Sequence, residues 1–196
     1  MDVNAPMDDR TLHKNLDNHF EAIELCIGRG LRMPALILVY SAIDFLAWLG
    51  RPESKPAVDR AEFIRWTDAY LLANGFSQCA AVDLYSARCA HLHTNAFQSR
   101  MTKNGEAAVV LYAWGTADPA ALMSAMRRIG KPDVRVVHVE TLIAAVKKAS
   151  DAFLGEVRAY EHRWATVLSR SAQFFDENPA LDQHINALTA RVDYPR

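Results

Sequence analysis

The stretch that decides the fold is "MPALILVYSAIDFLAWLG", which runs from Met33 to Gly50. It is apolar on nearly all sides of a helix, so it predicts the most deeply buried helix of the chain. Pro34 suits the first turn of this helix, and Gly50 and Pro52 end it. The run is slightly short for a membrane span and carries Asp44 near its middle, so we expect a core helix and no membrane partner.

Single apolar stripes predict further helices on both sides of this run. One helix is expected from about Asp9 to Ile27, and another is expected to open at Asp59 and break at Asn74. A fourth helix is expected to begin after a cap at Ser77 and to run to about His93. The stripe residues are Leu12, Leu16, Phe20, Ile23 and Ile27 in the first, and Phe63, Trp66, Tyr70 and Leu71 in the second.

The pattern changes after residue 100. The continuous apolar run from Ala107 to Trp114 predicts a strand, and "VRVVHV", Val134 to Val139, predicts a second one. Between them Asp118, Pro119 and Gly130 mark the start and the end of a short helix. We expect the two strands to pair as a small sheet beside the helices.

The last predicted element is one long helix from about Glu140 to Glu177, whose apolar residues alternate steps of four and three. It would span ~55 Å, more than the ~30 Å width of a small domain, so its end is expected to pack on a partner. The fold class is therefore mainly α: one domain over residues 1–196, with a core of about 9–177, a two-stranded insertion before the long last helix, and a tail of 178–196.

The composition and charge of the chain limit the classes of function that we expect. The chain has 196 residues, 51% of them hydrophobic, with a formal net charge of −1 and a pI near 6.6. A protein that holds nucleic acid mainly by bulk charge would be more basic, so any such binding needs a local patch. The three cysteines form no CxxC pair and the first ten residues do not resemble a signal peptide, which favours reduced thiols in a cytoplasmic protein.

The stretch "DLYSARCAHLHTN", residues 83 to 95, carries unusual chemistry for a buried helix. Arg88, Cys89, His91 and His93 lie within six residues. We expect the apolar face of this helix to be formed by Ala81, Leu84 or Tyr85, Cys89 and Leu92. Arg88 and His93 lie outside this apolar face, and both side chains can reach a single groove along one side of the helix.

The spacing Arg88-x-x-x-x-His93, on the fourth helix of an all-helical first half that is followed by a long helix, resembles the motif of the HEPN superfamily. The resemblance covers the helical body, about residues 9 to 177. It implies a helical bundle, a metal-independent endoribonuclease and a homodimer with a composite active site. Some members of that family are toxins with an antitoxin partner or other phage-defence components, and some have lost activity.

Under this resemblance His93 is the general acid or base and Arg88 binds the phosphate. Imidazole titrates near neutral pH, and a guanidinium gives planar contacts to a phosphorane. The substrate would be RNA, the products would carry 2′,3′-cyclic phosphate and 5′-hydroxyl ends, and no metal or cofactor would be needed.

Other residues are candidate supporting groups. Cys89 stands where the family usually has Asn, Asp or His, and a thiol is a weaker donor. His91 could supply a second imidazole, although it points away from Cys89 and His93. Tyr85 precedes Arg88 by one turn, and Asp44, which needs a partner inside an apolar helix, could pair with Arg88.

Three alternatives remain open at this point. A structural ion pair of Arg88 with Asp44 or Asp83 favours a catalytically silent HEPN-like module that dimerises or binds protein or RNA. Cys89, His91 and His93 have the residue types of a metal site, but no second cluster completes it. A basic patch of Arg127, Arg128, Lys131 and Arg135 could bind an RNA backbone, or could be a solvated helix end.

Overall fold

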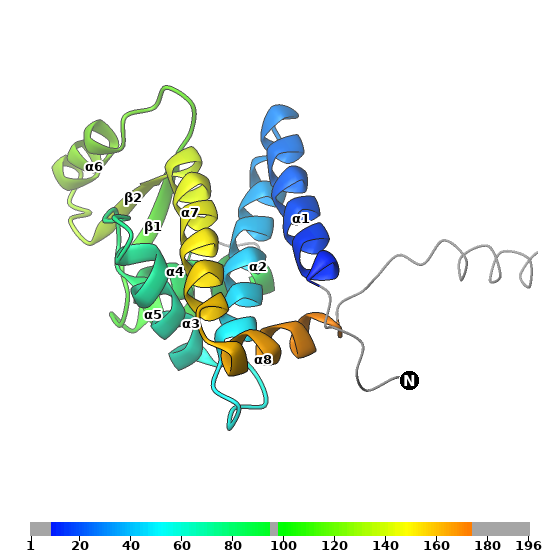
Figure 1. Ribbon diagram of the computed structural model, residues 1–196. Helices are drawn as coiled ribbons and strands as arrows, with labels where there is room; N and C mark the ends of the chain where they lie inside the picture. The colour runs from blue at the N-terminus through cyan, green and yellow to red at the C-terminus, as the bar shows by residue number, and fades with distance from the viewer. Residues whose placement is uncertain (1–8, 95–97, 174–196) are drawn as a thin grey trace, which may run out of the picture.

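The computed structural model describes residues 9–94 and 98–173; the side chains of His93 and Thr94 also lie outside the described part. The described chain is mainly helical, with a small parallel sheet placed before a long helix (Figure 1). The predicted tail, 178–196, lies outside the described residues.

An antiparallel helix pair forms one side of the bundle. Helix α1 (Arg10–Gly28) and helix α2 (Arg32–Gly50) are joined by three residues and pack along their length. Gly30 sits at φ +70°, a left-handed conformation that suits glycine, while its neighbour Leu31 donates to the Cys26 carbonyl. Both predicted helices are confirmed to within two residues.

Helix α2 is the centre of the molecule. It packs against α1, α3 (Arg60–Trp66), α4 (Ala81–Thr94), α7 (Val139–Arg158) and α8 (Glu161–Ser171). Among the described residues it is the one helix long and apolar enough to cross a membrane, and half of that apolar window is buried inside the bundle. Being covered on so many sides, α2 has the position of a core helix.

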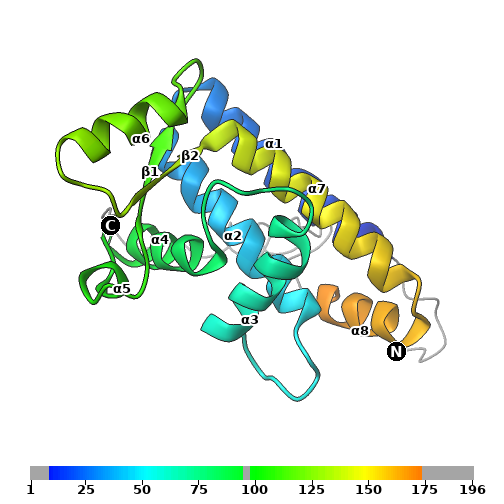
Figure 2. The same ribbon diagram turned by 90° about the vertical axis from the view of Figure 1, so that its left-hand side faces the viewer.

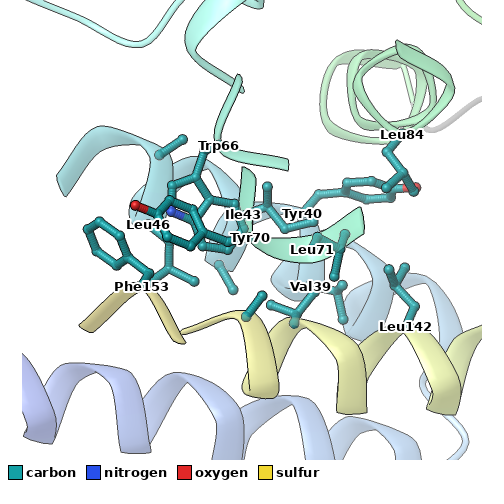
Figure 3. Packing of buried hydrophobic residues seen from close by; sticks show 14 of the residues in the cluster. Val39, Tyr40, Ile43, Leu46, Trp66, Tyr70, Leu71, Leu84, Leu142 and Phe153 are labelled. Carbon is teal, nitrogen blue, oxygen red and sulfur yellow. The ribbon is translucent and has the colours of Figure 1, made fainter. Parts of the chain in front are cut away.

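Aromatic side chains fill the space between α2, α3 and α7. Trp66 and Tyr70 pack around Phe153 with ring centroids 6.2 Å and 5.2 Å away, and Tyr40 reaches from α2 toward Leu84 on α4 (Figure 3). Asp59 caps α3 by accepting from the backbone N–H of Glu62, and this confirms the predicted start of this helix at Asp59. A π-helical segment, η1 (Thr67–Leu72), continues α3 and was not foreseen.

The two predicted strands are confirmed and pair in parallel. Strand β1 (Val109–Ala113) lies beside β2 (Val134–His138), with Val109 opposite Val134, and α6 (Pro119–Arg128) connects them. Asp118 caps α6 by accepting from Ala120 N–H, and Pro119 takes the first helical position. A short helix, α5 (Arg100–Lys103), precedes β1.

Both faces of this sheet are covered, which explains the continuous apolar runs. Val110, Tyr112 and Val137 belong to the main core, whereas Val109, Leu111, Ala113, Val134 and Val136 pack with α6. The sheet therefore separates α6 from α4 (Figure 2).

The single long helix predicted over Glu140–Glu177 is wrong. The chain breaks at Ala159 and Tyr160, where Tyr160 has an extended backbone, and α8 turns across the end of the bundle (Figure 1). The turn lets Val167 and Leu168 bury themselves instead of projecting past the bundle into water. An ion pair of Glu156 with Arg163, 2.6 Å, spans the corner.

Candidate functional site

Arg88 and Asp44 form the polar contact between α4 and α2. The Nε and Nη2 atoms of Arg88 each lie 2.8 Å from Oδ2 of Asp44, and the two side chains are 22% and 23% exposed. Burial lowers the pKa of Arg88, but the bond and charge of Asp44 outweigh burial and raise it above its ordinary value. The sequence-based expectation that Asp44 pairs with Arg88 is confirmed.

Two further candidates lie beside this pair. The Sγ atom of Cys89 is 4.0 Å from Nη1 of Arg88, and Tyr85 packs edge-on against Phe63 at 5.4 Å. Burial, and then the neighbouring Cys89 thiol, raises the pKa of Tyr85. The structure thus brings Asp44, Tyr85, Arg88 and Cys89 together at a half-exposed point between α2 and α4.

His93 lies on the last turn of α4, but its side chain is outside the described residues. Its backbone stands five residues after Arg88, about 7.5 Å further along the helix axis. Its role as an acid or base therefore stays a prediction.

The side chain of His91 points into the core, unlike that of Arg88. It is 5% exposed, and its Nε2 lies 3.1 Å from the hydroxyl of Tyr112 on β1, which in turn lies 2.6 Å from the hydroxyl of Tyr40 on α2. The Nδ1 atom of His91 has no hydrogen-bond partner among the described residues. Burial lowers the pKa of His91, so its ring is neutral near pH 7.

The expected apolar face of this helix was partly wrong. Cys89 and Leu92 are only half-buried, and the helix starts at Ala81 rather than after a cap at Ser77. At the start of the helix, the carboxylate of Asp83 accepts a hydrogen bond from the backbone N–H of Ala80. It also accepts one from the backbone N–H of Ala108. The buried positions of α4 are Ala81, Asp83, Leu84, Ser86, Ala87, Ala90 and His91.

Sequence reasoning missed the hydroxyl pair of Tyr40 and Tyr112. Tyr40 is fully buried, and burial, followed by the charge of Tyr112, raises its pKa well above the ordinary value. The available signal was a tyrosine in an otherwise apolar helix and another in an apolar strand, since a buried phenol needs a partner.

The basic candidates lie elsewhere. Arg127, Arg128 and Lys131 are exposed at the end of α6, and Arg135 is half-buried on β2. Lys131 and Arg135 line a groove of about 760 Å³ that also holds Asp83, Glu106 and Asp133. The groove reaches the first turn of α4 at Asp83, but neither Arg88 nor Asp44 lines it, so it is not part of the Arg88 site.

Within residues 9–94 and 98–173, no three His, Cys, Asp or Glu side chains gather as a metal site would require. A scan against protein-family models and searches of curated proteins and of solved structures found no match.

Proposed function

We propose that this protein is a metal-independent endoribonuclease of the HEPN type that acts in the cytoplasm as a homodimer. The observation that carries the proposal is the position of Arg88: a half-exposed guanidinium fixed by Asp44, on the same helix as His93 and five residues before it. The mainly helical architecture around α4 agrees with that assignment.

Arg88 would bind the scissile phosphate. A guanidinium is planar and stays charged, and here the carboxylate of Asp44 fixes its plane at the surface of the bundle through two bonds of 2.8 Å. A fixed cation at this place stabilises charge that develops on the phosphoryl oxygens, without reorganisation during the reaction.

His93 would move the protons. As a base it takes the proton of the 2′-hydroxyl, which attacks the adjacent phosphorus; as an acid it, or its copy in the second subunit, protonates the departing 5′-oxygen. The bond from phosphorus to the 5′-oxygen breaks, leaving a 2′,3′-cyclic phosphate and a 5′-hydroxyl. A role as a toxin with an antitoxin partner, or as a phage-defence component, belongs to the same proposal.

A second candidate is a catalytically silent HEPN-like module that binds protein or RNA. Two observations favour it: the charge of Arg88 is offset by Asp44, and the neighbouring Cys89 is a weak donor. Arg88 would then be a structural residue that fastens α4 to α2.

The test is cleavage of a mixed RNA pool in EDTA by the unmodified protein and by Arg88→Gln and His93→Gln. Arg100→Gln is the matched control, because Arg100 is exposed on α5. We expect both motif variants to lose at least about a hundredfold in rate, as is typical for a lost acid–base or oxyanion-binding group. The control should cleave normally, and the new 5′ ends should accept phosphate from a polynucleotide kinase directly.

No cleavage by the unmodified protein, or equal cleavage by all variants, contradicts the ribonuclease and leaves the binding module. The solution mass is the second measurement. A strict monomer that still cleaves RNA would overturn the composite site while keeping the activity.

A further inference from the structure

A second polar site lies at the end of α2, where α8 crosses the bundle. A pocket of about 370 Å³ opens there between the C-terminus of α2, the loop that follows it, and the corner of α7 and α8. Its charged lining residues are Arg51, Glu53, Arg163 and Arg170, together with His162. We call it the α2–α8 pocket.

Arg170 is the most deeply buried charge of this pocket, at 7% exposure. Its Nη1 donates to the carbonyls of Leu49 and Arg51, at 2.6 Å and 2.7 Å, so it closes the C-terminus of α2. No described carboxylate lies within ion-pair distance of Arg170. Burying a guanidinium without a nearby carboxylate costs free energy, and a bound anion would offset this cost.

Arg51 adds a second cation to the same wall. It stacks over the Trp48 ring at 4.5 Å and donates to the carbonyls of Trp48 and Lys55, at 2.6 Å and 2.9 Å. These contacts fix its guanidinium without neutralising it. Burial lowers the pKa of Arg170 most and repulsion from Arg51 lowers it further, while the carboxylate of Glu53 raises it. Three arginines and one carboxylate line the pocket, so positive charge exceeds negative charge there.

The negative charge that lines the pocket is small. Glu53 is its one lining carboxylate; it is well exposed and pairs with His162 at 3.2 Å. Arg163 also lines the pocket, and it forms an ion pair with Glu156, which does not line the pocket.

We propose that the α2–α8 pocket binds the phosphate group of a small phosphorylated ligand, with Arg51 and Arg170 as the main contacts. Guanidinium groups bind phosphate oxygens through paired N–H donors, which suits two arginines held in fixed orientations. The volume is in the range of small-ligand pockets and fits a group of nucleotide size. The proposal does not rest on the ribonuclease, because none of the motif residues lines this pocket.

The experiment is calorimetric titration of the full chain at pH 8 and low salt with inorganic phosphate, with adenosine monophosphate and with a short RNA. We expect saturable binding, tighter for the nucleotide than for phosphate alone. Arg51→Gln should weaken binding about tenfold or more, as expected for a lost charge-assisted contact. Arg60→Gln, at an exposed arginine paired with Glu106, is the control and should bind normally.

Glu53→Gln is the decisive variant, because a gain of binding cannot come from misfolding. Removing the lining carboxylate should tighten the binding of inorganic phosphate by several-fold, and salt should reduce the difference. Unchanged affinity in Glu53→Gln, or no heat with any probe, overturns the proposal. Binding of the short RNA alone, without phosphate or nucleotide binding, overturns the small-ligand assignment as well.

Discussion

Two of the polar links that join helix α4 to its neighbours have opposite character. The outer link is the ion pair of Arg88 with Asp44, which is more than a fifth exposed. The inner link is the neutral chain of His91, Tyr112 and Tyr40, which lies in the core and joins α4 to β1 and α2. In these two links the charged pair lies where water can reach it, and the neutral donors and acceptors lie in or against the core.

The difference between the links follows from desolvation. For a buried ion pair, the loss of hydration free energy can exceed the gain from electrostatic attraction. Phenol and imidazole groups enter the core at a smaller cost if each finds a hydrogen-bond partner. The inner link can therefore fix the position of α4, and the outer link can keep a charged group near the surface. Of the two links, only the outer one contains a permanent positive charge, which the proposed phosphate contact requires.

The largest effect is expected from breaking the inner link at its middle. Tyr112→Phe removes the hydroxyl that lies between Tyr40 and His91, and leaves two buried polar atoms without it. We expect a loss of about 3 kcal/mol of unfolding free energy, measured in urea. Tyr160→Phe, at an exposed tyrosine, is the control and should be neutral. A loss below about 1 kcal/mol in Tyr112→Phe would mean that the inner link does not hold α4.

A smaller effect is expected at the outer link. A double-mutant cycle with Asp44→Asn and Arg88→Gln should give a coupling energy of about 1–2 kcal/mol, between the values for exposed and buried pairs. Urea unfolding of the two single variants and the double variant measures it. A coupling near zero would show that the pair does not contribute to stability and is available for a ligand.

The inner link should also respond to pH. The pKa of His91 is lowered in the folded protein, so below about pH 6.5 the unfolded chain takes up a proton at this residue more readily than the folded one. Stability from His91 is thus complete above that pH and decreases as the pH falls. We expect a loss of stability from pH 6.5 to 5.5, of up to about 1 kcal/mol, that is missing in His91→Gln. Equal slopes in both proteins would place the titration at other residues.

The smallest effect is expected at an ion pair that belongs to neither link. Arg60 and Glu106 lie 2.9 Å apart, and both are well exposed. Solvent and salt screen such pairs, so Arg60→Gln should leave the thermal midpoint unchanged within error. A clear destabilisation by Arg60→Gln would show that solvent exposure alone does not explain why the outer and inner links differ in their contribution to stability.

Much of the fold was predictable because its signals are local. The stripe on α1, the apolar run of α2, the cap at Asp59 and the sequence from Asp118 to Pro119 each depend on residues a few positions apart. The pairing of Asp44 with Arg88 was also predictable, because a carboxylate in an apolar helix requires a partner and Arg88 was a candidate for it.

The errors occurred where a long-range contact overrides the local pattern. The alternation of four and three continues through Tyr160, and no Gly or Pro marks the break between α7 and α8. The break depends on the end of α2, which offers Arg170 its carbonyl partners. The inward direction of His91 likewise depends on Tyr112, which is 21 residues away.

The sequence by itself determined most of the helices and the two strands, because hydrophobic periodicity and capping act within one or two turns. Only the tertiary structure decided where α7 ends, which of the other charges are paired and which polar groups are buried. It placed Arg88 at a partly exposed ion pair, His91 in the core, and Arg170 beside Arg51 in a pocket where three arginines face one carboxylate. Those outcomes depend on desolvation, which is set by the elements that cover each side chain and not by its neighbours in sequence.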